Sequence, residues 1–140
     1  MATINPYLNF KGNTEEAFNF YRSVFGGEFE IIQRFKDTPE AERLPATDHD
    51  KIMHIALPIG KNNILMGTDA LESAGQTLTQ GNNFSLSIST DSDDETGKIF
   101  NALSAGGTVT MPLDKMFWGS YFGMCTDKFG VQWMVSNGTK

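Results

Sequence analysis

Two stretches of the chain, NTEEAFNFYRSVFGG at residues 13–27 and DDETGKIFNALSAGG at residues 93–107, follow the same plan. Each begins with polar residues that include a glutamate, continues with apolar residues at helical spacing, and ends at a Gly-Gly pair. An offset of 80 residues relates Glu15 to Glu95, Phe20 to Phe100, and Gly26-Gly27 to Gly106-Gly107. The repeat predicts one structural unit duplicated, with the two copies enclosing a single site between matched positions.

Composition argues against a nucleic-acid-binding or membrane-spanning protein. The chain has 140 residues, of which 39% are hydrophobic and 20% charged, and this balance is typical of a globular domain with its own core. The net charge is -6 and the basic residues are scattered, so we expect no nucleic-acid partner. No stretch approaches the roughly 20 apolar residues that span a bilayer, so we expect no membrane partner. The single cysteine, Cys125, cannot form an internal disulfide and fits a cytoplasmic protein.

The first half reads as strand, helix and three strands. A strand is expected over residues 4–10, with Leu8 facing one side and Tyr7 the other. Asn13 and Glu16 form a cap signature for a helix that Gly26 ends. Its apolar stripe is Ala17, Phe20, Tyr21, Val24 and Phe25. A strand at 29–35, a solvated loop at 36–50 and a hairpin of 52–59 with 64–67 follow.

The second half repeats the scheme after a polar linker at residues 69–82. We expect a strand at 84–89, a helix capped by Ser92 with Glu95, a strand at 108–111, and a hairpin of 121–126 with 131–136. The prediction is therefore an α+β fold, a single domain made of two tandem βαβββ repeats, about 1–68 and 83–137. Each repeat would bury its helix on one sheet face and leave the other face for its twin.

Three separated motifs carry a family resemblance: YLNFKGNTEEAFNFYRSVFGGEF at 7–29, MHIAL at 53–57 and FWGSYFGMCTDKFGVQWMV at 117–135. Together they resemble the PhnB-like branch of the glyoxalase/bleomycin resistance protein/dioxygenase superfamily, also called vicinal oxygen chelate proteins. The resemblance implies two paired βαβββ modules that form curved mixed sheets around a cleft, usually in a homodimer. It does not imply a reaction, because this fold hosts lyases, dioxygenases, epimerases and drug-binding proteins.

The resemblance also implies where a metal would be held. Enzymes of the superfamily usually bind a divalent cation through side chains at the start of the first strand and on the last strand of each module. Those positions fall at Tyr7, Met66, Ser87 and Met134. None is a usual ligand for such a cation, which prefers carboxylate or imidazole. Shifting the strand register offers only Asn5, Asn9, Gln132, Trp133 or serines. We therefore expect no metal at the usual site, and a divalent metal elsewhere stays an open alternative.

Other titratable residues offer few sites. His49, in Asp48-His49-Asp50, resembles a ligand cluster but lies in a charge-rich segment, where a solvated turn is the simpler interpretation. His54 lies within a strand and is either a hydrogen-bonded core residue or an acid/base or liganding residue. Cys125 is interpreted as a buried, inert thiol. Glu15 and Glu95 are interpreted as helix-capping residues.

Aromatic residues and methionines gather near the end of the chain, within residues 116–134. If Met134 faces the cleft, Gln132 faces it too and Trp133 packs under the helix. The predicted ligand-binding residues are Tyr7, His54, Met66, Ser87, Trp118, Tyr121, Gln132 and Met134.

Two functions follow from these residues. The first is metal-independent binding of a small organic molecule in an aromatic and Met-lined cleft. The alternative is a lyase or isomerase with catalytic residues His54 and Tyr7, in which a dimer partner could help His54 to hold a metal. Some relatives carry the label demethylubiquinone methyltransferase. This sequence lacks the glycine-rich strand-to-helix turn expected of such an enzyme, so that function is not predicted.

Overall fold

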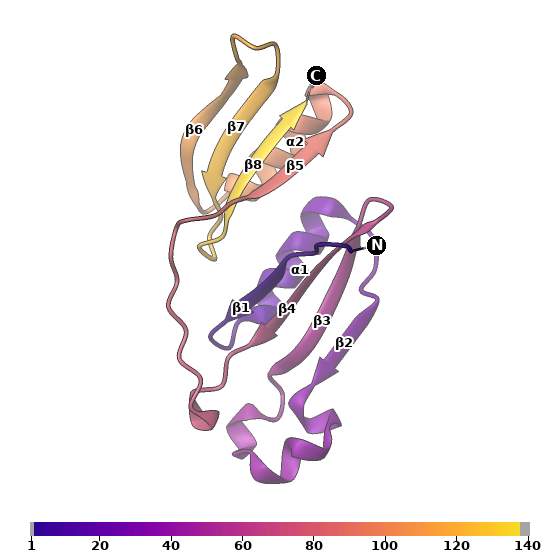
Figure 1. Cartoon of the computed structure of the whole chain (residues 1–140), viewed down its shortest axis with the longest axis vertical. Helices are drawn as coiled ribbons and strands as arrows, with labels where there is room; N and C mark the ends of the chain where they lie inside the picture. Colours follow the sequence, from indigo (N-terminus) through magenta and orange to yellow (C-terminus); the bar gives the residue numbers. More distant parts are fainter. Residues whose placement is uncertain (1, 138–140) are drawn as a thin grey trace. The chain divides into compact units, whose positions relative to one another are not determined.

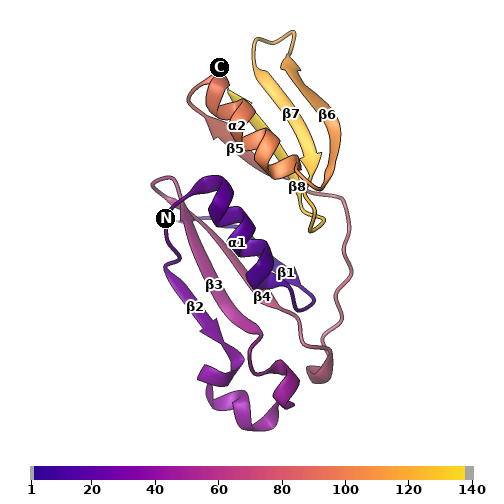
Figure 2. The ribbon, with the colours of Figure 1, turned by 180° about the vertical axis from the view of Figure 1, so that it is seen from behind.

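The computed structural model describes residues 2–137, which divide into two compact units, one up to Thr79 and one from Gln80. Each unit is a four-stranded sheet with one long helix packed on one face. In Figure 1 helix α1 lies behind its sheet, and in Figure 2 it lies in front. No helix of the described residues has the length and apolar character needed to cross a membrane.

Unit 1 follows the order βαβββ. Its main elements are β1 (Tyr7–Phe10), α1 (Thr14–Phe25), β2 (Ile31–Arg34), β3 (Ile52–Ile59) and β4 (Asn63–Asp69). The spatial order is β1-β4-β3-β2, with β1 parallel to β4 and the other pairs antiparallel. A short 3-10 helix, η4 (Glu72–Ala74), follows β4.

Unit 2 repeats this topology. Its elements are β5 (Leu86–Thr90), α2 (Asp93–Ser104), β6 (Thr108–Lys115), β7 (Tyr121–Thr126) and β8 (Gln132–Asn137). The spatial order is β5-β8-β7-β6, and β5 is parallel to β8. The predicted α+β fold of two βαβββ repeats is confirmed. Strands β1 and β2 are shorter than predicted, β4 and β6 are longer, and β8 has the predicted length but lies one residue further along the chain.

Alternation along the strands builds the core of each unit beneath its helix. In β1, Leu8 and Phe10 are buried while Tyr7 is 45% exposed, as the alternation predicts. The helix packs closely at Gly67, where an added Cβ would lie 2.6 Å from the Phe18 ring. Of the stripe predicted for α1, Ala17 and Tyr21 are buried, and Phe20, Val24 and Phe25 are half-buried. Phe18, which the prediction left out, is buried.

The two helices begin differently, although the sequence signatures look alike. In unit 2 the Ser92 hydroxyl accepts a hydrogen bond from the Glu95 amide at 3.1 Å, as predicted. In unit 1 the Asn13 side chain makes no capping bond, and the buried Asp69 carboxylate accepts from the Thr14 amide at 3.0 Å instead. The predicted Asn13 cap is therefore wrong, because a group from β4 occupies its place.

Glu15 also departs from the predicted repeat. Its carboxylate forms a two-pronged ion pair with Arg34 of β2, at 2.9 and 2.6 Å. The Arg34 guanidinium holds the pKa of Glu15 below its usual value. Glu95 instead accepts a hydrogen bond from the Asp91 amide, next to the helix start. Glu15 therefore joins the helix to the sheet edge, whereas Glu95 has the capping role that was predicted for both.

The segment between β2 and β3, predicted as a solvated loop, is mostly exposed and has more regular structure than the prediction gave it. It forms three 3-10 turns, η1 (Phe35–Asp37), η2 (Pro39–Arg43) and η3 (Ala46–Asp48). His49 stabilises them, since its Nε2 lies 2.9 Å from the Ala41 carbonyl oxygen and 3.2 Å from that of Leu44. Local side-chain-to-backbone bonds therefore give this polar segment regular turns.

Replacing Asp69 by Ala should destabilise unit 1 strongly. The carboxylate accepts from the amides of Gly12, Thr14 and Ile52, and from the Thr14 hydroxyl. Because buried donors would lose their partner, we expect the free energy of unfolding to fall by about 3 kcal/mol. Urea denaturation followed by circular dichroism measures this loss. The exposed Glu42→Ala should change stability by less than about 0.5 kcal/mol. A loss below about 1 kcal/mol for Asp69→Ala would contradict the assigned role.

Candidate functional site

Each sheet has a second face, opposite its helix, which we call its helix-free face. In unit 1, alternation and strand register place on this face Tyr7 and Asn9 of β1, Ile31 and Gln33 of β2, His54 and Ala56 of β3, and Met66 and Thr68 of β4. One row crosses the whole sheet, because Tyr7 pairs with Met66, Met66 with Ala56, and Ala56 with Ile31. We call these four residues the unit 1 row.

A matching row crosses the helix-free face of unit 2. Ser87 pairs with Met134, Met134 with Met124, and Met124 with Met111. We call these four residues the unit 2 row. The predicted correspondence of Tyr7 with Ser87 and of Met66 with Met134 agrees with the register, since each pair occupies the same two places in its row. Both rows place at least one thioether beside a side chain that carries a hydroxyl.

A hydrogen bond between Tyr7 and His54 distinguishes unit 1. The Tyr7 hydroxyl lies 3.0 Å from His54 Nδ1, and the two rings are stacked with their centroids 5.6 Å apart. Tyr7 is on β1 and His54 on β3, so the contact spans the intervening strand β4. The two residues predicted as catalytic therefore lie together, although 47 positions separate them in sequence.

The chemistry of this pair depends on which ring nitrogen carries the proton. Burial raises the pKa of Tyr7, so the phenol keeps its proton at neutral pH. When Tyr7 donates to Nδ1, the neutral ring carries its hydrogen on Nε2 and offers a donor there. When Nδ1 donates to the phenol oxygen, Nε2 is an acceptor. The pair can therefore donate to a ligand or accept a proton from it through one atom.

The same places in unit 2 carry no such pair. Phe122 lies two residues before Met124, as His54 lies two residues before Ala56, and Ser87 stands where Tyr7 stands. The Trp118 ring meets the Phe122 ring edge to face, with the centroids 5.9 Å apart. Trp118 is 55% exposed. The helix-free face of unit 2 is therefore richer in aromatic and thioether surface and has no titratable pair of this kind.

Three other predictions concern the orientation of side chains in unit 2. Trp133 is buried under the helix, and its indole nitrogen donates to Asp127 at 2.8 Å, so the predicted packing is confirmed. Tyr121 shares a strand face with Gly123, at which a Cβ would meet the Phe100 ring of α2. Tyr121 therefore lies on the helix side and not beside Met134.

Gln132 shares the face of Met134, as predicted, but its side-chain amide nitrogen donates a hydrogen bond to the Phe84 carbonyl.

The donor set does not fit the metal that the superfamily suggests. The superfamily's ligand positions hold a phenol, a hydroxyl and two thioethers, which are poor ligands for hard or borderline cations. Within residues 2–137, no three His, Cys, Asp or Glu side chains come together as a metal site would require. His49 contacts backbone carbonyls, Asp48 pairs with Lys51, and Asp50 pairs with Lys36, so the Asp48-His49-Asp50 cluster does not converge.

Comparison with known proteins identifies the family. The family model described as 3-demethylubiquinone-9 3-methyltransferase matches residues 2–136. The chain belongs to this family, the PhnB-like branch of the glyoxalase/bleomycin resistance/dioxygenase superfamily. The description is a family label, and no specific activity or ligand follows from it for this chain.

Relatives of known sequence or structure cover nearly the whole chain. Protein PA1353 from Pseudomonas aeruginosa is 41% identical, with a TM-score of 0.87 and 100% of both chains covered. Protein YjdN of Escherichia coli is 32% identical over 95% of this chain and 93% of its own. A Bacillus cereus protein named as a putative 3-demethylubiquinone-9 3-methyltransferase, PhnB protein, is 26% identical, with a TM-score of 0.77 and coverage of 98% and 100%.

The glyoxalase fold itself is seen in a more distant structure. A glyoxalase-related enzyme from Fulvimarina pelagi has a TM-score of 0.66 at 16% identity, over 99% of this chain and 89% of its own. This PhnB-like protein therefore shares a fold with glyoxalase relatives, and the match at this identity concerns the fold alone.

Cys125 should lower stability at high pH. It is buried on β7, and desolvation raises the pKa of its thiol from 9.0 to about 11. Because the unfolded thiol loses its proton first, its contribution to stability is complete below pH 9 and is lost as the pH rises to about 11. Comparing urea unfolding of the wild type and Cys125→Ala from pH 8 to 11 isolates this effect. Parallel stability curves would contradict it.

Proposed function

We propose that this PhnB-like protein binds a small organic ligand with an apolar or planar surface on the helix-free faces of its sheets, without chelating a metal. The unit 2 row carries the proposal, since it aligns Met111, Met124 and Met134 beside the hydroxyl of Ser87. Such a surface offers dispersion contacts with polarizable sulfur and one group that forms a hydrogen bond.

Aromatic side chains strengthen this surface. Trp118 and Phe122 lie edge to face, and Phe122 shares the helix-free face with Met124. Methionine side chains adapt to ligands of irregular shape and make favourable contacts with aromatic rings. The combination favours a ligand with an unsaturated or cyclic part over a small, strongly hydrated ion.

Methyl transfer is not part of this proposal, although the family label names it. The sequence has no glycine-rich turn between a strand and a helix of the kind that cradles a nucleotide-like cofactor. The proposal includes the homodimer that the family resemblance implies and the reducing cytoplasm that suits the free Cys125. Light scattering of the purified chain measures the assembly directly.

The neutral fluorescent probe N-phenyl-1-naphthylamine tests the binding surface. We expect saturable fluorescence enhancement in the wild type and about tenfold weaker binding in Met124→Ser, because the substitution removes apolar contact from the centre of the row. Val109→Thr is the matched control, since Val109 is exposed on the same sheet but pairs with Cys125 on the other face.

Two results would overturn this proposal. One is equal binding of the probe by the wild type and Met124→Ser, with both proteins folded by circular dichroism. The other is stoichiometric, tight binding of Zn, Ni, Mn or Fe at the positions of Tyr7, Met66, Ser87 and Met134, detected by metal analysis of the purified protein and its variants.

A second function is favoured by the contact between Tyr7 and His54. When His54 Nδ1 carries the hydrogen and donates it to the Tyr7 oxygen 3.0 Å away, Nε2 is free to act as a general base in a lyase or isomerase. In such a step a carbon–hydrogen bond breaks, the proton moves to His54 Nε2, and the electron pair moves onto the substrate's carbonyl oxygen. Met66, which pairs with Tyr7, would contact the apolar part of the substrate.

Deuterium exchange tests this second function. With hydroxyacetone in D₂O, followed by proton NMR, we expect His54→Ala to slow the protein-dependent exchange by about 10²- to 10⁴-fold. Tyr7→Phe should slow the exchange less than His54→Ala, since the substitution keeps the aromatic ring at position 7. His49→Ala is the control, because the ring of this histidine bonds to the backbone carbonyls of Ala41 and Leu44 and not to Tyr7. Exchange that is unchanged in His54→Ala would remove the catalytic interpretation.

A further inference from the structure

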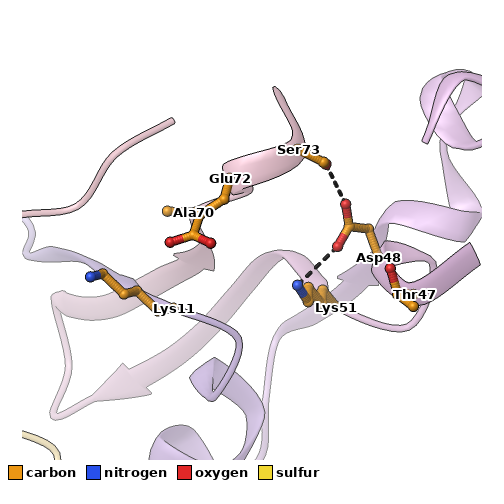
Figure 3. A pocket seen from close by; sticks show the side chains of 7 residues that line it. All are labelled: Lys11, Thr47, Asp48, Lys51, Ala70, Glu72 and Ser73. Carbon is orange, nitrogen blue, oxygen red and sulfur yellow. Dashed lines mark hydrogen bonds and ion pairs between the residues drawn. The ribbon is translucent and has the colours of Figure 1, made fainter. Parts of the chain in front are cut away.

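A polar pocket opens where the parallel strands β1 and β4 of unit 1 end. It has a volume of about 350 Å³ and is lined by Lys11, Thr47, Asp48, Lys51, Ala70, Glu72 and Ser73 (Figure 3). These residues come from the connection after β1, from η3, from the position just before β3 and from the segment around η4. None belongs to the unit 1 row or to the pair of Tyr7 and His54, so the pocket is separate from the site described above.

Part of the pocket wall is already neutralised. Asp48 is only 4% exposed and accepts from Lys51 Nζ at 2.9 Å and from the Ser73 hydroxyl at 2.5 Å. These bonds lower the pKa of Asp48, and the same carboxylate raises the pKa of Lys51. Both groups therefore stay ionised at neutral pH and balance each other, and they form a rigid side of the pocket.

The remaining charges of the pocket are one cation and one anion. Among the described residues, neither Lys11 nor Glu72 has an ion-pair partner within 4 Å or a side-chain hydrogen bond. Figure 3 shows both side chains on the left of the view, with the Asp48 cluster on the right. The pocket thus presents an ammonium group and a carboxylate that form no ion pair within 4 Å among the described residues, although the charge of Glu72 also helps to raise the pKa of Lys51.

We propose that this pocket binds a small zwitterion of the α-amino acid class, with the ligand carboxylate at Lys11 and the ligand ammonium at Glu72. A ligand with one charge would pair only one of these residues, whereas a zwitterion pairs both and keeps the pocket neutral. The Thr47 hydroxyl can donate to or accept from the ligand, because no hydrogen bond of its side chain is found within residues 2–137. The volume lies at the lower end of the range of about 300–1,000 Å³ for ligand sites, which favours a small side chain.

Titration of the full chain with L-alanine, followed by ¹⁵N–¹H NMR, tests the proposal. Propionate lacks the ammonium group and ethylamine lacks the carboxylate, so each should bind at least tenfold more weakly than L-alanine. We expect saturable shifts at Lys11, Glu72 and Ser73, with affinity that falls as salt rises, since Lys11 and Glu72 are exposed to water.

Matched variants separate the two ionic contacts. Lys11→Met and Glu72→Gln should each weaken L-alanine binding about tenfold, and the double exchange of Lys11→Glu with Glu72→Lys should restore most of it. Lys61→Met, at the exposed turn between β3 and β4, should leave binding unchanged. The Met124→Ser variant should also bind L-alanine normally, so failure here is distinguishable from failure of the proposed apolar surface.

Three outcomes would overturn the inference. Propionate that binds as tightly as L-alanine, with no effect of Glu72→Gln, would show a simple anion site. Ethylamine that binds as tightly, with no effect of Lys11→Met, would show a simple cation site. The absence of saturable shifts in a well-folded wild type would show that the pocket takes no zwitterion of this size.

Discussion

The buried carboxylate of Asp69 is the constraint on which unit 1 depends. It stands at the end of β4 and accepts hydrogen bonds from the amides before and within the first turn of α1, and from the first amide of β3. The side chain of Asp69 therefore sets where α1 begins, and it ties the end of β4 to the start of β3. With those ends tied, the register of β1 on β4 follows, and Tyr7 is placed opposite Met66. The unit 1 row is a consequence of this arrangement.

Unit 2 reaches the same topology by another route. Its corresponding strand ends at Asn137, whose amide donates to Asp93 of α2 at 2.6 Å. A different buried carboxylate, that of Asp127, organises the turn between β7 and β8 by accepting from the amides of Phe129 and Val131. The two units thus share backbone geometry while different polar contacts hold it. This freedom lets the helix-free faces differ: unit 1 keeps a phenol and an imidazole, and unit 2 keeps methionines and aromatic rings.

The sequence predicted the elements well because their signals are local. Helix-spaced apolar residues and Gly-Gly pairs located both helices, and alternation located the strands whose partners are adjacent in the chain. The offsets between the two repeats also related Tyr7 to Ser87 and Met66 to Met134, and the register agrees, since each pair occupies equivalent places in the two sheets. Local signals failed at Asn13, because the carboxylate of Asp69, which is far away in the sequence, accepts the hydrogen bond at the helix start instead. They indicated that residues 36–50 are solvated but did not predict the 3-10 turns there, because polar composition alone does not reveal such turns.

The sequence by itself determined which residue types stand at the superfamily's ligand positions, and therefore that those positions lack carboxylate and imidazole. Only the tertiary structure decided that Tyr7 and His54 share a hydrogen bond, that Met111 joins Met124 and Met134, and that Tyr121 belongs to the helix side. The polar pocket of Lys11 and Glu72 likewise could not be predicted. The physical reason is that side-chain chemistry is local, whereas a site is assembled by strand pairing between residues far apart in the chain.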